Sequence, residues 1–189
     1  MLASGQGSNL QAILDAQRDG VLDADVVAVI SDKPDAYALT RAKVSGVKAV
    51  ALPKVTGEER TAYDARLATQ VEEFDPHVVV LAGWMRLLTM AFLGRFPNRV
   101  INLHPALPGE FPGTHAIERA LEASQRVGLR RTGAMVHYVA DEGVDDGPVI
   151  ASTEVLIHPD DSVESLSQRV HAAEHELIVR ALQLVGGTS

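Results

Sequence analysis

The sequence has 189 residues, 46% of them hydrophobic and 22% charged, which is enough for one domain with a buried core. It contains no cysteine, which excludes a disulfide framework, a zinc–thiolate site and a cysteine nucleophile. The net charge of −8 argues against a large basic surface for nucleic acid, and no apolar run approaches the roughly 20 residues of a membrane span. We therefore expect a cytoplasmic protein with neither nucleic-acid nor membrane partners.

The chain opens on a short strand and a glycine-rich turn. The strand Met1–Ala3 precedes the turn Ser4–Asn9, and apolar residues at helical spacing then follow: Leu10, Ile13 and Leu14. Three residues are short for a central strand, which usually has five or six, so we expect the natural strand to begin upstream of Met1. The glycines allow close approach of a ligand, and a helix N-terminus favours an anion. The alternative is a tight turn with Asn9 as a helix cap.

Three near-continuous apolar runs are typical of buried strands: Val26–Ile30, Val78–Ala82 and Val100–Leu103. Between the first two, Thr56 and Glu59 have the spacing of a capping box, which predicts a helix start there. The apolar face of that helix is Tyr63, Leu67 and Val71. Phe74–Pro76 ends it before the next strand. Strands alternating with helices predict a doubly wound, mostly parallel α/β sheet of the Rossmann-like kind, with right-handed crossovers.

The last third of the chain has a different pattern. Two further strands, Thr132–Val139 and Val149–Val155, flank the acidic, glycine-containing stretch Ala140–Gly147. From Ser162 a long helix is expected, with an apolar side made of Val163, Leu166, Val170, Leu177 and Ala181. We expect these elements to extend the same sheet in antiparallel fashion, so that residues 1–189 form a single domain.

Asn102 and His104 stand at the C-terminal end of a predicted strand. Ligands bind at this edge of open α/β sheets, and strand alternation places both side chains on the same side. An amide donor beside an imidazole suits acyl transfer, in which an oxyanion is stabilised and protonated. The alternative is structural, with His104 bonded to a loop carbonyl and Asn102 closing a turn.

The stretch Asp141–Pro148 holds four carboxylates in eight residues. One interpretation is a solvated acidic turn; another places one carboxylate against His104, where it would raise the pKa of the imidazole. Binding of magnesium or calcium is a third, disfavoured because the ligand periodicity of an EF-hand is missing. His115 and His137 are weaker candidates, since a histidine within an apolar strand is usually a hydrogen-bonded core residue.

Five segments in this order resemble the phosphoribosylglycinamide formyltransferase family, the folate-dependent enzymes of purine synthesis, over essentially the whole chain. They are Ser4–Gln11, Val80–Arg86, Asn102–Ala106, Phe111–His115 and Asp145–Ile150. The resemblance implies transfer of a formyl group from 10-formyltetrahydrofolate to the amine of 5-phosphoribosylglycinamide. It implies small-molecule substrates, no metal and a chain acting as a monomer or homodimer.

The resemblance also implies roles for individual residues. Asn102 would donate to the formyl oxygen, His104 would act as general acid, and Asp145 would orient His104 and help to accept the proton of the amine. The substrate phosphate and its glycinamide part would contact Gly7, Ser8, Asn9 and Glu174. The 10-formyltetrahydrofolate site would comprise Arg60, Met85, Arg86, Leu87, Leu88, Asn102, Ala140, Asp141, Glu142, Gly143 and Val144.

The sequence departs from the family pattern in two loops. Ala106–Gly109 differs from the usual order, which leaves the shape of that loop open. The acidic turn carries Gly143 as an extra residue and Asp146 where a glycine is usual, so Asp146 rivals Asp145 as the partner of His104.

Two related families share the Asn-x-His and Asp arrangement. Methionyl-tRNA formyltransferase would carry an additional C-terminal domain and a basic surface for tRNA, which a net charge of −8 disfavours. Formyltetrahydrofolate hydrolase would carry an additional N-terminal domain. A non-catalytic protein that binds a phosphorylated metabolite would need the glycine-rich turn but not Asn102, His104 and Asp145 together.

Overall fold

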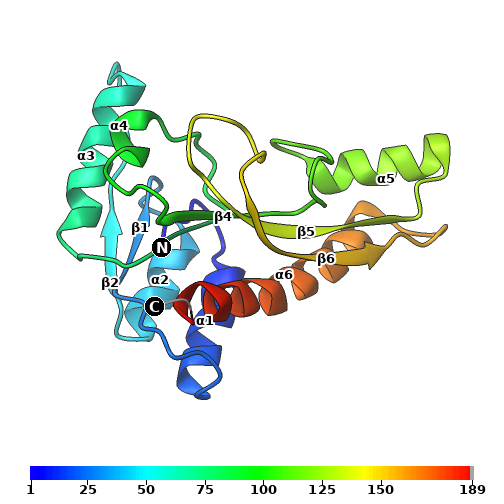
Figure 1. The fold of residues 1–189 in the computed structure, drawn as a ribbon, viewed down its shortest axis with the longest axis horizontal. Coiled ribbons are helices and arrows are strands. Elements are labelled where there is room, and N and C mark those ends of the chain that lie inside the picture. The colour runs from blue at the N-terminus through cyan, green and yellow to red at the C-terminus, as the bar shows by residue number, and fades with distance from the viewer. Residues whose placement is uncertain (188–189) are drawn as a thin grey trace.

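The computed structural model describes residues 1–187 and contains a mixed sheet flanked by helices (Figure 1). The strands are β1 (Ala28–Ser31), β2 (Lys48–Ala51), β3 (Val79–Ala82), β4 (Val100–His104), β5 (Arg131–Tyr138) and β6 (Val149–Leu156). The helices are α1 (Ser8–Arg18), α2 (Tyr37–Val44), α3 (Arg60–Glu72), α4 (Met90–Leu93), α5 (Ala116–Val127) and α6 (Val163–Gly186). The last two residues of the expected domain, 188 and 189, lie outside the described part.

The sheet has parallel pairs at one side and antiparallel pairs at the other. β1 pairs with β2 and β3 with β4, both in parallel, while β4–β5 and β5–β6 are antiparallel. Leu2 joins the two parallel pairs, because it forms parallel bridges to Ile30 of β1 and to Leu81 of β3. The short first strand therefore lies at the centre of the sheet, as expected. Its proposed extension upstream of Met1 stays a prediction.

Alternate residues of the central strands face two separate helical layers. On β3, Val79 and Leu81 pack with α3 and α4, whereas Val80 and Ala82 pack in the cluster that includes residues of α1 and α6. Strands buried on both faces explain the continuous apolar runs in the sequence. The expected doubly wound architecture is confirmed.

The C-terminal elements form an arm away from the parallel strands. In Figure 1, β5 and β6 run out to the right between α5 on one side and α6 on the other. α6 begins at Ser162, whose hydroxyl accepts from the Ser165 N–H in a capping box. Of the expected apolar side of α6, Leu166, Val170, Leu177 and Ala181 are buried, while Val163 is 43% exposed. No helix within residues 1–187 is long and apolar enough to cross a membrane.

The helix start expected at Thr56 is wrong. α3 begins at Arg60, and its N-cap residue Glu59 makes no side-chain cap bond. Glu58 stabilises the turn before α3, because its carboxylate accepts from the Val55 N–H at 2.9 Å and pairs with Arg66 of α3. The elements α2, β2, α4 and α5 were not expected from the sequence. The first three have only eight, four and four residues, whereas α5 has 12 residues and an apolar face that includes Ile117, Ala120 and Leu121.

Candidate functional site

Asn102 and His104 project from the end of β4 on the side opposite the α1–α6 layer. Their neighbours Ile101 and Leu103 are buried in the cluster with α6 residues, so alternation turns the two polar side chains the other way. His104 is 4% exposed and Asn102 is half-buried. The shared facing inferred from the sequence is therefore present.

Asp145 lies between these two side chains and holds both through different oxygens. Its Oδ1 accepts from the Asn102 amide at 2.9 Å, and its Oδ2 lies 3.2 Å from His104 Nδ1. The Gly113 N–H donates to Oδ2 at 2.8 Å, and His137 Nε2 lies 3.4 Å from Oδ1. A carboxylate from the loop between β5 and β6 thus ties the end of β4 to the loop before α5.

Asp146 does not occupy this position. It is exposed, and its carboxylate lies against the backbone of Gly143, where an added Cβ would come within 2.4 Å of its Oδ1. The carboxylate that faces His104 is therefore that of Asp145. The extra Gly143 provides the room for Asp146.

The loops around His104 are held in left-handed backbone conformations. Phe111, His115 and Asp145 have φ values of 45°, 58° and 54°. Such conformations are unfavourable for residues other than glycine, although aspartate tolerates them better than most. The Phe111 carbonyl lies 3.1 Å from His104 Nε2. Backbone strain is concentrated where the polar groups converge.

The contacts of His104 with Asp145 and the Phe111 carbonyl oppose the effect of burial on its pKa. Burial lowers the pKa of His104, while the Asp145 carboxylate and the Phe111 carbonyl favour the protonated ring, and the net pKa is below its usual value. Burial raises the pKa of Asp145, but bonds from His137 and Gly113 and the charge of His104 outweigh it, so its net pKa is lowered. At neutral pH the arrangement is a carboxylate beside a largely neutral imidazole.

His137 belongs to the cluster, although the sequence marked it only as a weak candidate. It is 2% exposed, lies directly across from Asn102 in the β4–β5 register, and its Nε2 is 3.3 Å from the Asn102 amide nitrogen. Its Nδ1 lies 3.0 Å from the Tyr138 carbonyl. The strand pairing that brings it to Asn102 is a long-range feature, so periodicity within β5 could not reveal it.

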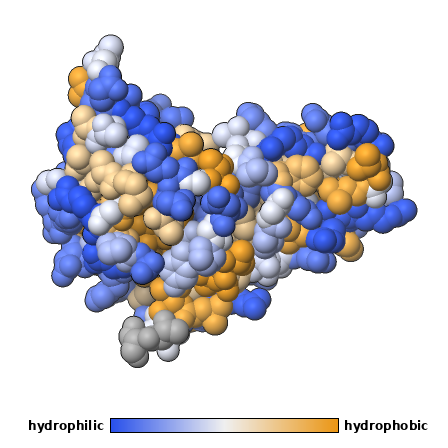
Figure 2. Space-filling model, turned by 45° about the horizontal axis from the view of Figure 1, so that its top comes forward, coloured by the Kyte–Doolittle hydropathy of each residue, from blue (hydrophilic) through white to orange (hydrophobic). Residues whose placement is uncertain are grey.

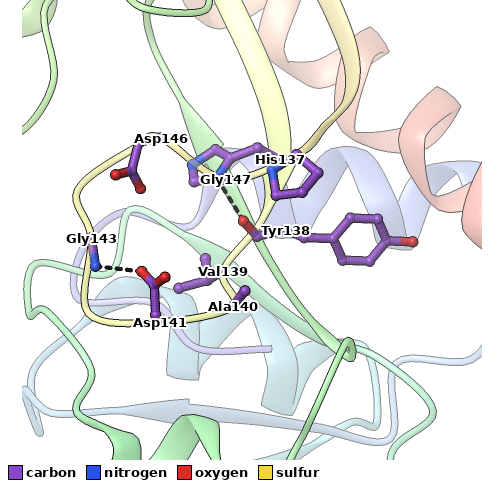
Figure 3. A pocket seen from close by; sticks show the side chains of 9 residues that line it. His137, Tyr138, Val139, Ala140, Asp141, Gly143, Asp146 and Gly147 are labelled. Carbon is purple, nitrogen blue, oxygen red and sulfur yellow. Dashed lines mark hydrogen bonds between the residues drawn. The ribbon is translucent and has the colours of Figure 1, made fainter.

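A cavity of about 160 Å³ opens beneath the loop that carries Asp145. Figure 3 shows the loop arching around it, with Asp141, Gly143 and Asp146 on the arch and His137 at the strand side. Ala140, Asp141 and Gly143, three of the expected cofactor-binding residues, line it. Glu142 is directed elsewhere, since its carboxylate accepts from the Met90 N–H at 2.9 Å. The loop is thereby tied to the start of α4.

The segment Met85–Leu88 is held against the sheet edge at several points. The Met85 N–H donates to Ser4 Oγ at 3.1 Å, and Arg60 Nε donates to the Leu87 carbonyl at 3.1 Å. Arg86 pairs with the buried Asp32 at 2.7 Å. Leu88 is buried in the α3–α4 core, so it presents at most its backbone to a ligand.

Apolar side chains stay exposed beside this segment. Met85 is 63% exposed, Leu87 50% and Val144 37%. In Figure 2 the surface is hollowed between the main body and the arm, with hydrophobic surface beside the hollow. Exposed apolar side chains beside a surface hollow suit a flat, aromatic ligand.

The glycine-rich turn forms the start of α1. Gly7 is the N-cap, in the left-handed conformation and without a side-chain cap bond, so the helix-capping alternative for Asn9 is wrong. As at any helix start, the first N–H groups have no intrahelical partner and favour an anion. The Asn9 amide bonds to Glu174 of α6, which is 5% exposed. The expected substrate-binding residues Gly7, Ser8, Asn9 and Glu174 are thus gathered at one place.

Residues 1–182 match the formyl transferase family. The chain belongs to this family. It is 46% identical to phosphoribosylglycinamide formyltransferase of Schizosaccharomyces pombe, over 98% of this chain and 95% of that protein. It is 43% identical to the trifunctional purine biosynthetic protein adenosine-3 of Drosophila melanogaster, over 100% of this chain and 14% of that protein. The crystal structure of glycinamide ribonucleotide transformylase 1 from Symbiobacterium toebii superposes with a TM-score of 0.92 at 42% identity, over 98% of this chain and 86% of that one.

These comparisons confirm the family resemblance inferred from the sequence and the α/β fold expected of a formyl transferase. The roles of individual residues remain predictions. Among residues 1–187, no group of three or more histidine or carboxylate side chains is placed to hold a metal ion.

The turn of this formyl transferase chain makes Gly7 sensitive to substitution. We expect Gly7→Ala to lower the free energy of unfolding by about 2–4 kcal/mol, because it adds left-handed strain and a clash. The new Cβ would lie 2.8 Å from Ala38 Cβ and 2.9 Å from its Cα. Gly5→Ala is the matched control, since nothing lies within 4 Å of a Cβ there. Urea titration of both variants measures the difference; equal losses would contradict the packing of α2 on Gly7.

Burial of Glu174 should make the free energy of unfolding depend on pH. Burial raises the pKa of its carboxyl to about 7, against a smaller opposite effect of the Asn9 bond. Between pH 4.5 and 7 the folded chain then holds a proton that the unfolded chain loses, so this group makes stability fall as pH rises through that window. We expect Glu174→Gln to remove the fall and to be more stable than wild type at pH 8, by up to about 3 kcal/mol.

Urea unfolding at pH 5 and at pH 8 tests this expectation. Glu176→Gln, at an exposed position of the same helix, is the control and should leave the pH profile unchanged. A Glu174→Gln variant that follows the wild-type profile at both pH values would show that Glu174 is ionised in the folded protein.

Proposed function

We propose that this chain transfers the formyl group of 10-formyltetrahydrofolate to the amine of 5-phosphoribosylglycinamide, as a single cytoplasmic domain of residues 1–189 acting as a monomer or homodimer. The observation that carries the proposal is the convergence of Asn102, His104 and Asp145 at the C-terminal end of β4. The 46% identity to phosphoribosylglycinamide formyltransferase of Schizosaccharomyces pombe, over 98% of this chain, also supports the proposal.

In the proposed reaction the substrate amine attacks the formyl carbon directly. The Asn102 amide gives one hydrogen to Asp145 Oδ1, and its nitrogen also lies 3.3 Å from His137 Nε2. In the reaction its second hydrogen would donate to the oxyanion that develops on the formyl oxygen. The attacking amine loses a proton, which Asp145 helps to accept and to pass to His104, and the departing nitrogen of the folate gains that proton from His104. His104 supplies the general acid, and Asp145 beside its Nδ1 stabilises the imidazolium form and orients the ring.

The phosphate end of the proposed substrate would be held by α1 and α6. The phosphate would lie on the N–H groups of Gly7, Ser8 and Asn9, where the helix dipole favours negative charge. Glu174, beside Asn9, would accept from the hydroxyl or amide groups next to the phosphate. This arrangement extends the substrate from the start of α1 toward the end of β4.

The residues present fit a reduced folate in the hollow beside β4. The polar pterin would contact the loop Ala140–Val144, which lines or closes the cavity, and the backbone of Met85–Leu88. The exposed Met85 and Leu87 side chains would cover its apolar ring faces. Arg60, whose Nε is bonded to the Leu87 carbonyl, would present its remaining donors to the carboxylate tail.

Turnover with both substrates tests the proposal. Purified protein is mixed with 5-phosphoribosylglycinamide and 10-formyltetrahydrofolate, and formation of tetrahydrofolate is followed by absorbance. We expect folate deformylation only when the amine is present. Deformylation at the same rate without the amine would identify a hydrolase, and no reaction under either condition would overturn the proposed function.

A further inference from the structure

The glycine-rich turn is built on α2, a helix that the sequence patterns did not reveal. The Ala38 N–H donates to the Gly5 carbonyl at 3.1 Å, and Gly7 packs so closely on Ala38 that no side chain fits between them. The shape of the turn therefore depends on where α2 lies.

Arg41 of α2 contacts both the glycine-rich turn and the helix α1 that follows it. Its Nε donates to the Gln6 carbonyl at 2.9 Å, just before Gly7, and its Nη1 donates to Gln11 Oε1 at 2.9 Å, in the first turns of α1. The guanidinium also lies over the Tyr37 ring, 4.9 Å from its centroid. Two directed bonds and a ring contact fix one conformation of a side chain that otherwise has many.

The position of Arg41 matters because the protein as a whole repels anions. The net charge is −8, while a phosphate monoester carries nearly two negative charges at neutral pH. A fixed guanidinium beside the helix start offsets that repulsion locally. Its charge also reaches α6: burial lowers the pKa of His175, and the charges of His171 and Arg41 lower it further.

We propose that Arg41 is a positioning residue for the substrate phosphate, which holds the glycine-rich turn in its anion-binding shape and places a positive charge beside it. The inference rests on the proposed function for the identity of the phosphorylated substrate. Arg41 acts through the backbone of the turn and through its charge. It is thus separate from the groups that touch the formyl carbon.

Three variants separate the role of Arg41 from a general effect on the fold. Arg41→Met keeps an unbranched apolar stem and removes both the donors and the charge, whereas Arg41→Lys keeps the charge but not the paired bonds. Lys43→Ala, at an exposed position of the same helix, is the matched control. Each is assayed for kcat and for the KM of both substrates.

For Arg41→Met we expect the KM for 5-phosphoribosylglycinamide to rise at least about tenfold, equivalent to about 1.4 kcal/mol, with kcat and the KM for the folate within twofold of wild type. Arg41→Lys should give an intermediate KM, and Lys43→Ala should match wild type. A purely structural role would instead change kcat and both KM values together.

Calorimetric titration with ribose 5-phosphate gives a second readout that does not need turnover. Wild type should bind it and Arg41→Met should bind at least about tenfold more weakly. If wild type fails to turn over but shows this difference, the proposed function fails and the role of Arg41 stands. Equal binding by both proteins, no binding by wild type, or an unchanged KM in Arg41→Met would overturn the inference. Should Arg41→Met not fold, Arg41→Lys decides: wild-type KM and binding in that variant would overturn it.

Discussion

Replacing His104 with alanine is expected to lower kcat by roughly 10²–10⁴-fold, the range for loss of a general acid. The Nδ1 of the ring lies 3.2 Å from Oδ2 of Asp145, whose Oδ1 accepts from the Asn102 amide. An imidazole takes up and releases a proton near neutral pH, which suits it to protonate the departing nitrogen. Steady-state assay with both substrates at saturation measures the loss.

Controls distinguish lost chemistry from lost structure. His104 is buried and its Nε2 meets the Phe111 carbonyl at 3.1 Å, so thermal unfolding of His104→Ala must be recorded beside its activity. His115→Ala, at an exposed histidine four residues after Phe111, should retain activity. Added imidazole should restore part of the rate to His104→Ala. A rate within threefold of wild type in a folded His104→Ala protein would remove His104 from the mechanism.

Asn102→Ala is expected to lower kcat over the same range, through loss of the donor to the oxyanion.

Among substitutions that exchange a single atom, Asp145→Asn should lower kcat the most. In Asp145→Asn an N–H group replaces one carboxylate oxygen, yet Asn102 donates to Oδ1 and the Gly113 N–H donates to Oδ2. Whichever way the amide is turned, one donor then faces another donor.

We expect Asp145→Asn to lower kcat by about 10²–10⁴-fold and to shift the pH–rate profile to lower pH, because the carboxylate no longer raises the pKa of His104. Asparagine tolerates the left-handed φ of 54° as aspartate does, so the backbone contributes little to the loss. Asp146→Asn is the matched control on the exposed neighbour, and it should stay within about threefold of wild type. The reverse ranking of the two variants would show that Asp146 orients His104 during turnover.

Much of the fold follows from local pattern. β3 and β4 appear as uninterrupted apolar runs because both of their faces are covered, and α6 has a 3.6-residue period with a capping serine at Ser162. Among the elements that were not expected, α5 has a regular amphipathic pattern, whereas α2, β2 and α4 are short, and the side chains of β2 are all at least partly exposed. In those elements tertiary contacts outweigh intrinsic preference.

The position of the candidate site follows partly from sequence as well. Asn102 and His104 share a face of β4 because strand side chains alternate, and this alternation is a local property. His137 and Arg41 reach the site and the glycine-rich turn only through strand pairing and helix packing across 35 residues each. No spacing within one segment encodes such a contact.

The sequence by itself determined the family, the α/β alternation, and the place of Asn102 and His104 at a strand end, since each depends on short-range order along the chain. Only the tertiary structure decided that Asp145, and not Asp146, faces His104. Adjacent residues in a loop point in directions set by the backbone, and here the left-handed Asp145 and the room above Gly143 turn the two carboxylates apart. The same holds for the glycine-rich turn, whose shape depends on α2 packing against Gly7.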